Sequence, residues 1–65
     1  MNTFEAALRE RIEMYIDNIS DEIVENEKLL EMYKNSESRQ EDVLKYFIER
    51  LDVIKKEFEI VLKRI

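Results

Sequence analysis

Apolar residues in the second half of the chain recur at alternating spacings of three and four residues. This series runs from Leu44 to Ile65, and each of its seven positions is apolar. In the first half a similar series runs from Ile12 to Tyr33, and only Asn26 interrupts it. The alternation is the heptad pattern of a helix that buries one seam against a neighbouring helix. It predicts two amphipathic helices with an intra-hairpin core of Ile12, Ile16, Ile19, Ile23, Leu30, Leu44, Phe47, Leu51, Ile54, Phe58, Val61 and Ile65.

Asn26 stands at a seam position that should be apolar. One interpretation is that its amide sets the register or the oligomeric state, because a buried amide must find a hydrogen-bond partner. The other is that Asn26 lies at the edge of the seam, half exposed to water. The sequence leaves both interpretations open.

The two apolar series do not belong to one continuous seam. Extending the first series would place Glu37 and Gln40, both polar, at seam positions. The segment 35–38 reads Asn-Ser-Glu-Ser, which is typical of a turn. Ser38, three residues before Glu41, has the sequence of a capping box that starts a new helix. The sequence therefore predicts a helical hairpin.

The chain is predicted to form a single helical-hairpin domain, because 65 residues make one small domain at most. Asn2, three residues before Glu5, is suited to cap the first helix. A break or bend of the first helix near 18–20 and one continuous helical rod are the alternatives. The predicted bounds are 1–65 for the domain, about 3–34 for the first helix, about 35–38 for the turn and about 39–65 for the second helix.

A short turn makes the two helices antiparallel neighbours. Counting outward from the turn sets Ile16 beside Phe58 and Ile12 beside Val61. The first seven residues, which include Phe4, then extend beyond the end of the second helix by roughly 10 Å.

One hairpin interface does not cover all the apolar surface of the second helix. Positions 46, 53 and 60 of that helix are also apolar, and they recur every seven residues on a side away from the seam. The first helix cannot cover them while it covers the seam. A chain of this size is also marginal on its own core. We therefore predict an all-α antiparallel hairpin that dimerises into a four-helix bundle. The predicted oligomer or partner interface consists of Tyr46, Val53 and Ile60 on the second helix and Leu8, Tyr15 and Leu29 on the first.

The composition narrows the possible chemistry. The chain contains no Cys, His or Gly, so it has no thiol nucleophile, no imidazole base and no glycine-rich phosphate loop. We expect no catalytic residue, no cofactor and no metal site, and hence no enzymatic activity. With no targeting segment and no apolar stretch of the roughly 20 residues that a membrane span needs, we expect a cytoplasmic protein without a membrane partner.

Two pairs of carboxylates form a Glu-x-x-Glu and Glu-x-x-Asp pattern, namely Glu22 with Glu25 and Glu49 with Asp52. This pattern resembles the magnesium-binding signature of the all-α nucleotide pyrophosphohydrolases of the MazG and dUTPase type. The resemblance implies carboxylates that chelate Mg²⁺ and position a triphosphate. The heptad frame, however, places Glu49 and Asp52 on the solvent face of the second helix, so we predict that the four do not converge within one hairpin.

Nucleic acid is a disfavoured partner, because the formal net charge is −5 and phosphate binding depends on a basic footprint. The general plan of a dimerising hairpin is nevertheless similar to that of the Rop-type RNA-binding plasmid regulators. An RNA site would then use the cations near the open end: Arg9, Arg11, Lys55, Lys56, Lys63 and Arg64.

These observations favour a small non-catalytic protein–protein interaction module. We expect self-association as a homodimer, and a regulator or antagonist that docks a helical face onto a larger partner protein. A structural assembly or scaffolding element and an RNA-binding four-helix bundle are the alternatives.

Overall fold

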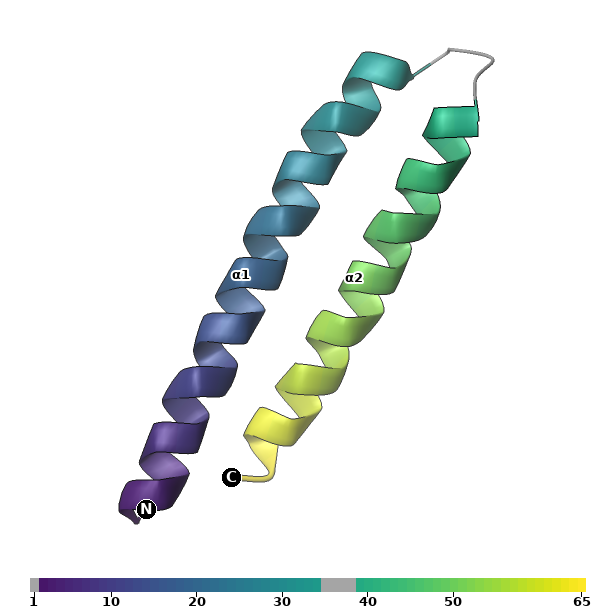
Figure 1. The fold of residues 1–65 in the computed structure, drawn as a ribbon. Coiled ribbons are helices and arrows are strands. Elements are labelled where there is room, and N and C mark those ends of the chain that lie inside the picture. Colours follow the sequence, from purple (N-terminus) through teal and green to yellow (C-terminus); the bar gives the residue numbers. More distant parts are fainter. Residues whose placement is uncertain (1, 35–38) are drawn as a thin grey trace.

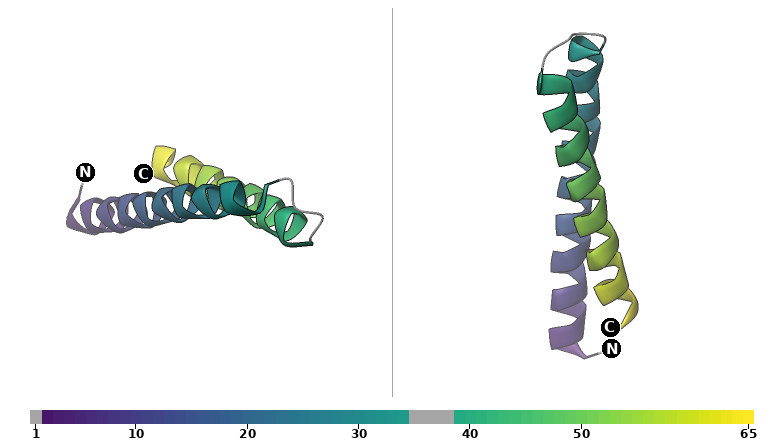
Figure 2. Two further views of the ribbon diagram at one scale, coloured as in Figure 1. Left: turned by 90° about the horizontal axis from the view of Figure 1, so that it is seen from above. Right: turned by 90° about the vertical axis from the view of Figure 1, so that its right-hand side faces the viewer.

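The computed structural model describes residues 2–34 and 39–65. Helix α1 spans Thr3–Tyr33 and helix α2 spans Arg39–Lys63. The two helices run antiparallel and side by side, with both chain termini at one end (Figures 1 and 2). The molecule is a narrow rod of 53 × 15 × 11 Å, and the described residues contain no strand. The predicted all-α hairpin is confirmed.

The start of α1 is capped as its sequence predicts. The side-chain oxygen of Asn2 accepts a hydrogen bond of 2.7 Å from the backbone amide of Glu5. The Asn2 side-chain amide also donates to the Glu5 carboxylate at 3.1 Å. This cap satisfies one of the amides that every helix leaves open at its N-terminus. The predicted turn and the capping box at Ser38 lie outside the described residues.

The two helices begin at the predicted residues 3 and 39, and they end at Tyr33 and Lys63, one and two residues before the predicted ends. At the end of α2 the amides of Arg64 and Ile65 bond to carbonyl oxygens three residues earlier, at 3.0 and 3.4 Å. This spacing is a tightened last turn.

Helix α1 continues without interruption through residues 18–20, so the prediction's alternative of a break there is wrong, as is that of a single rod. The Ser20 hydroxyl donates to the Ile16 carbonyl oxygen at 2.9 Å, which satisfies it within its own helix.

The predicted core residues of α1 are all buried or half-buried. Ile12 is the most buried described residue, at 5% exposed, and the other predicted core residues of α1 are half-buried. Asn26 is also half-buried, and its side-chain amide donates to the Glu22 carbonyl oxygen at 2.7 Å. The half-exposed interpretation of Asn26 therefore describes the hairpin.

The predicted seam of α2 needs a correction. Leu44, Leu51, Phe58 and Ile65 are half-buried as predicted. The other three predicted core residues of this helix are exposed, at 45% for Phe47, 39% for Ile54 and 44% for Val61.

Ile48 and Leu62 take their place in the hairpin core. Both are half-buried, and Ile48 lines a hollow together with Ile23 and Leu30 of α1. Two series with spacings of three and four share the positions of Leu44, Leu51, Phe58 and Ile65 and differ in the flank that they add. The predicted series is apolar at every position, whereas the series through Ile48 and Leu62 contains Lys55, so the spacing favoured the predicted one. The packed helix is rotated toward the flank of Ile48 and Leu62.

The axial alignment of the helices agrees with the count from the turn. The ring centroids of Tyr15 and Phe58 lie 5.8 Å apart, one residue from the predicted level of Ile16 and Phe58. Near the open end, Arg9 Nη1 donates to the Leu62 carbonyl oxygen at 3.3 Å. The Arg9 side chain of α1 thus provides a hydrogen-bond donor to a carbonyl group near the C-terminus of α2.

The hairpin buries little of itself. It exposes 5367 Å² of surface, whereas a compact protein of its 8.0 kDa mass exposes roughly 4450 Å². Among the described residues Ile12 alone is buried, and it is still 5% exposed. Two helices share only one interface, so the outward faces of both stay in contact with water.

Candidate interaction face

Seven of the twelve exposed large apolar side chains of the described residues lie on one side of the two-helix layer. Two contacts establish this side: the ring of Tyr15 borders Phe58, and Leu29 and Val43 line the same hollow. Residues separated by 7, 11 or 14 positions return to about the same side of a helix, which extends each strip along its helix. The apolar face, as the name is used here, consists of Phe4, Tyr15 and Leu29 from α1 and Val43, Phe47, Ile54 and Val61 from α2.

The opposite side of the layer, here called the polar face, carries charged groups. On α2, Lys45 pairs with Glu41 at 3.1 Å and Lys56 with Asp52 at 2.9 Å. Asp52 raises the pKa of Lys56 above its ordinary value of 10.5, first by accepting a hydrogen bond and then through its negative charge. A hollow on this side is lined by Ile23, Glu27, Leu30, Lys45, Ile48, Glu49 and Asp52.

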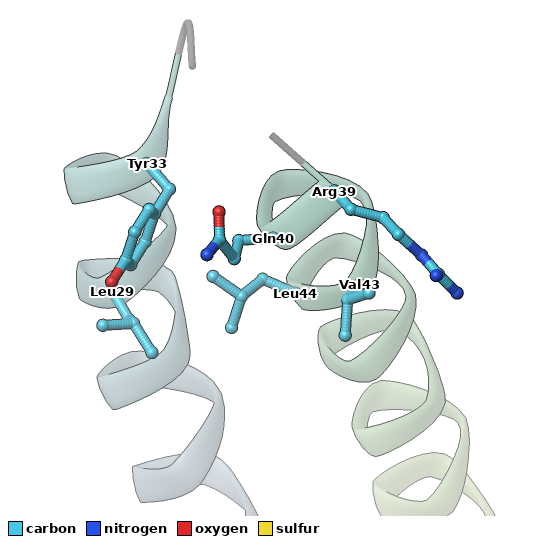
Figure 3. A pocket seen from close by; sticks show the side chains of 6 residues that line it. All are labelled: Leu29, Tyr33, Arg39, Gln40, Val43 and Leu44. Atoms are coloured by element: carbon cyan, nitrogen blue, oxygen red, sulfur yellow. The ribbon is translucent and has the colours of Figure 1, made fainter. Parts of the chain in front are cut away.

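A second hollow, the loop-end pocket, lies where the apolar face approaches the connection between the helices. Its volume is about 570 Å³. Leu29 and Tyr33 on α1 lie opposite Gln40 and Leu44 on α2, and Arg39 extends away from the centre (Figure 3). Val43 completes the lining. The pocket is open to solvent and its walls are mostly carbon, which suits an apolar side chain.

The structure divides the predicted interface residues between two surfaces. Tyr15 and Leu29 belong to the apolar face, and Leu8 is half-buried beside them. Tyr46 and Ile60 are exposed on a neighbouring strip of α2 that points further from α1, and Val53 on that strip is half-buried. The predicted intermolecular role of these residues remains a prediction.

The spacing of apolar residues predicts Phe47, Ile54 and Val61 in the hairpin core, so it does not predict the main part of the apolar face. A signal was present: with Val43, these residues form an apolar strip at spacings of four and seven. That spacing alone could not show whether the strip faces α1 or solvent.

The carboxylates of the magnesium-type pattern lie on opposite sides of the hairpin. Glu22 lies seven residues from both Tyr15 and Leu29, so it shares their side of α1. Glu49 lines the hollow of the polar face, and Asp52 there is paired with Lys56. Within residues 2–34 and 39–65, no three acidic groups are placed so as to hold a metal ion.

The cations near the open end do not form one free cluster. Arg9 bonds to the Leu62 carbonyl oxygen and lies 3.8 Å from the Glu13 carboxylate. Lys56 is paired with Asp52, and Lys55 is half-buried. The exposed cations that remain are Arg11, Lys63 and Arg64.

No protein-family model, curated protein or solved structure matches the chain. Neither helix, over the residues that the structure describes, combines the length and the apolar content that a membrane crossing requires.

Proposed function

We propose that this chain is a non-catalytic protein–protein interaction module that acts by packing its apolar face against a complementary helical surface. The observation that supports this function is the asymmetry of the two-helix layer. One side presents Phe47, Ile54 and Val61 to solvent, and the other carries the ion pairs of Lys45 and Lys56. Exposed apolar strips of this kind on small proteins commonly mark binding sites.

The energetic reason is the cost of leaving these side chains in water. Burying one large apolar side chain fully contributes roughly 1.5–3 kcal/mol, and each of these three is already partly covered by its own helix. The free energy gained by burying several such side chains exceeds the entropic cost of association only if all of them are buried in the same complex. Residues on one side of the hairpin meet this condition. Tyr46 and Ile60 lie outside the apolar face. They form a separate surface on which a larger protein that this chain regulates would bind.

Position-specific crosslinking in cells tests the proposal. A photoreactive phenylalanine analogue at position 47 lies on the apolar face, and the same analogue at position 49 lies on the polar face as the matched control. We expect crosslinked products from position 47 and none from position 49. Introducing Ile54→Glu should abolish the products while circular dichroism shows that the helices persist. Equal yields from both positions, or none from either, would contradict the proposed function.

A further inference from the structure

We propose that the apolar face is covered by a second copy of this chain, in a two-fold antiparallel dimer. The two hairpin layers lie face to face with their loop ends at opposite ends of the bundle. The two-fold axis passes through the level of Ile54, and Phe4 of each copy enters the loop-end pocket of the other. This inference rests on the proposed function, because it names the partner of the same face.

The apolar residues of α2 are arranged symmetrically about Ile54. Phe47 and Val61 lie seven residues, or two helical turns, on either side of it. In a two-fold pair of antiparallel helices, residues at equal distances from the axis meet. Phe47 then packs against the partner's Val61, and Ile54 packs against the partner's Ile54. One large and one smaller side chain meet at each outer level, which fills the space evenly.

The charges that border this strip are complementary under the same symmetry. Arg50 and Glu57 lie on either side of the axis, both exposed, and neither forms an ion pair with another described residue. In an antiparallel pair, Arg50, four residues before Ile54, comes within one residue of the level of the partner's Glu57, which is three residues after it. The opposite charges favour this pairing. In a two-fold pair with both loop ends together, each α2 would lie over the partner's α1, so this charge pairing belongs to the antiparallel arrangement alone.

Helix α1 has its midpoint at the same level. Since Tyr15 lies beside Phe58, Ile54 lies level with residue 19 of α1, and the midpoint of Thr3–Tyr33 is residue 18. An axis at this level lets the two α1 helices overlap along their full length. It also brings Arg11 within about two residues of the level of the partner's Glu25, which pairs with Lys28 of its own helix at 3.2 Å.

Phe4 is left uncovered by its own hairpin and lies at the distance that this symmetry requires. It precedes the midpoint of α1 by 14 residues and is 73% exposed. The axis carries it to the last turn of the partner's α1, which is where the loop-end pocket lies. The partner's Leu29 and Leu44 are among the residues that line that pocket (Figure 3). An exposed aromatic ring thus meets an apolar hollow at each end of the dimer.

The area available is sufficient for a stable dimer. The hairpin exposes 5367 Å², an excess of roughly 900 Å² over a compact protein of its mass. A standard protein–protein interface buries about 800 Å² on each partner. Covering the apolar face would bring the exposed area close to that of an ordinary compact protein.

Charge reversal tests the pairing. Sedimentation equilibrium should show a dimer, with a dissociation constant raised at least about tenfold by Arg50→Glu and by Glu57→Arg. The double variant should recover most of the wild-type affinity. Glu49→Arg on the polar face is the matched control and should change the dissociation constant less than threefold. Equal weakening in the double variant would overturn the proposed pairing.

Phe4→Ala tests the pocket without disturbing the hairpin core. We expect at least tenfold weaker dimerisation with unchanged helicity. Met32→Ala is the control, because Met32 is equally exposed but lies on another side of α1. Equal effects of the two substitutions would remove Phe4 from the interface.

A distance between nitroxide labels on Lys34→Cys distinguishes the orientations. The chain has no cysteine of its own, so labelling is specific. The antiparallel dimer places the two labels at opposite ends, about 45 Å apart for helices of this length. A short distance would overturn the antiparallel arrangement. If the wild-type chain is a monomer that crosslinks from position 47 to a different protein, the dimer is wrong and the proposed function still holds. If position 47 gives no crosslink at all, both the dimer and the proposed function are wrong.

Discussion

Replacing Ile12 with alanine removes three carbon atoms from the most buried position of the hairpin, which is 5% exposed. At about 0.8 kcal/mol per buried methylene-sized group, the lost burial amounts to about 2.4 kcal/mol. Alanine is a better helix former than isoleucine, which offsets roughly 0.4 kcal/mol of this loss. A large residual cavity is not expected, because a two-helix layer can close around the site. The net loss of unfolding free energy is therefore about 2 kcal/mol.

This loss is large for a chain of 65 residues, whose total stability is of the order of 3–10 kcal/mol. The assay is urea unfolding followed by far-ultraviolet circular dichroism, with all variants at one protein concentration. Met14→Ala is the matched control, because Met14 lies in the same helix and is exposed; its effect should stay within about 0.5 kcal/mol. If Ile12→Ala left the urea midpoint unchanged, or if Met14→Ala cost as much, the assignment of Ile12 to the centre of the hairpin would be refuted.

Three further predictions concern α2, the Asp52 pair and the seam. Ile48→Lys should destabilise the hairpin at every concentration in urea melts, whereas Ile54→Lys should remove the dimer in sedimentation and leave the dilute hairpin nearly as stable as wild type. Asp52→Asn should lower the pKa of Lys56 toward 10.5 in a nuclear magnetic resonance titration, because Asp52 raises that pKa. The stabilisation from this ion pair is therefore present below pH 10.5 and is lost as the pH rises through the raised pKa. Asn26→Leu should raise the unfolding free energy by about 1 kcal/mol and keep the sedimentation mass unchanged, and a changed mass would instead assign Asn26 a role in oligomeric state.

The sequence by itself determined the two helices, their first residues and the cap at Asn2. It also determined the seam of α1 and the axial alignment of the helices. These features depend on residues close together in the chain and on the number of residues that separate each position from the turn. A cap needs only neighbouring residues, and α1 has a single well-defined apolar seam from Ile12 to Leu30. The axial level of Phe58 against α1 depends only on where the turn lies.

The tertiary structure decided the rotation of α2 about its own axis. Phe47, Ile54 and Val61 recur every seven residues as a core seam does, and so do Ile48, Lys55 and Leu62. Periodicity gives the angle between these strips and not which of them faces α1. Only the packed pair of helices shows the choice, because burying one flank leaves the other in water.

The candidate interaction face depends on that same choice. The sequence showed that α2 carries more apolar surface than one hairpin can cover, and it placed the excess at Tyr46, Val53 and Ile60. The rotation of α2 adds Ile54 and its neighbours to the exposed surface, on the same side as Tyr15 of α1. The pocket near Leu29 also required the structure, because side chains from two helices form it. A surface shared by two helices depends on their relative rotation, and no local signal along the chain specifies that angle.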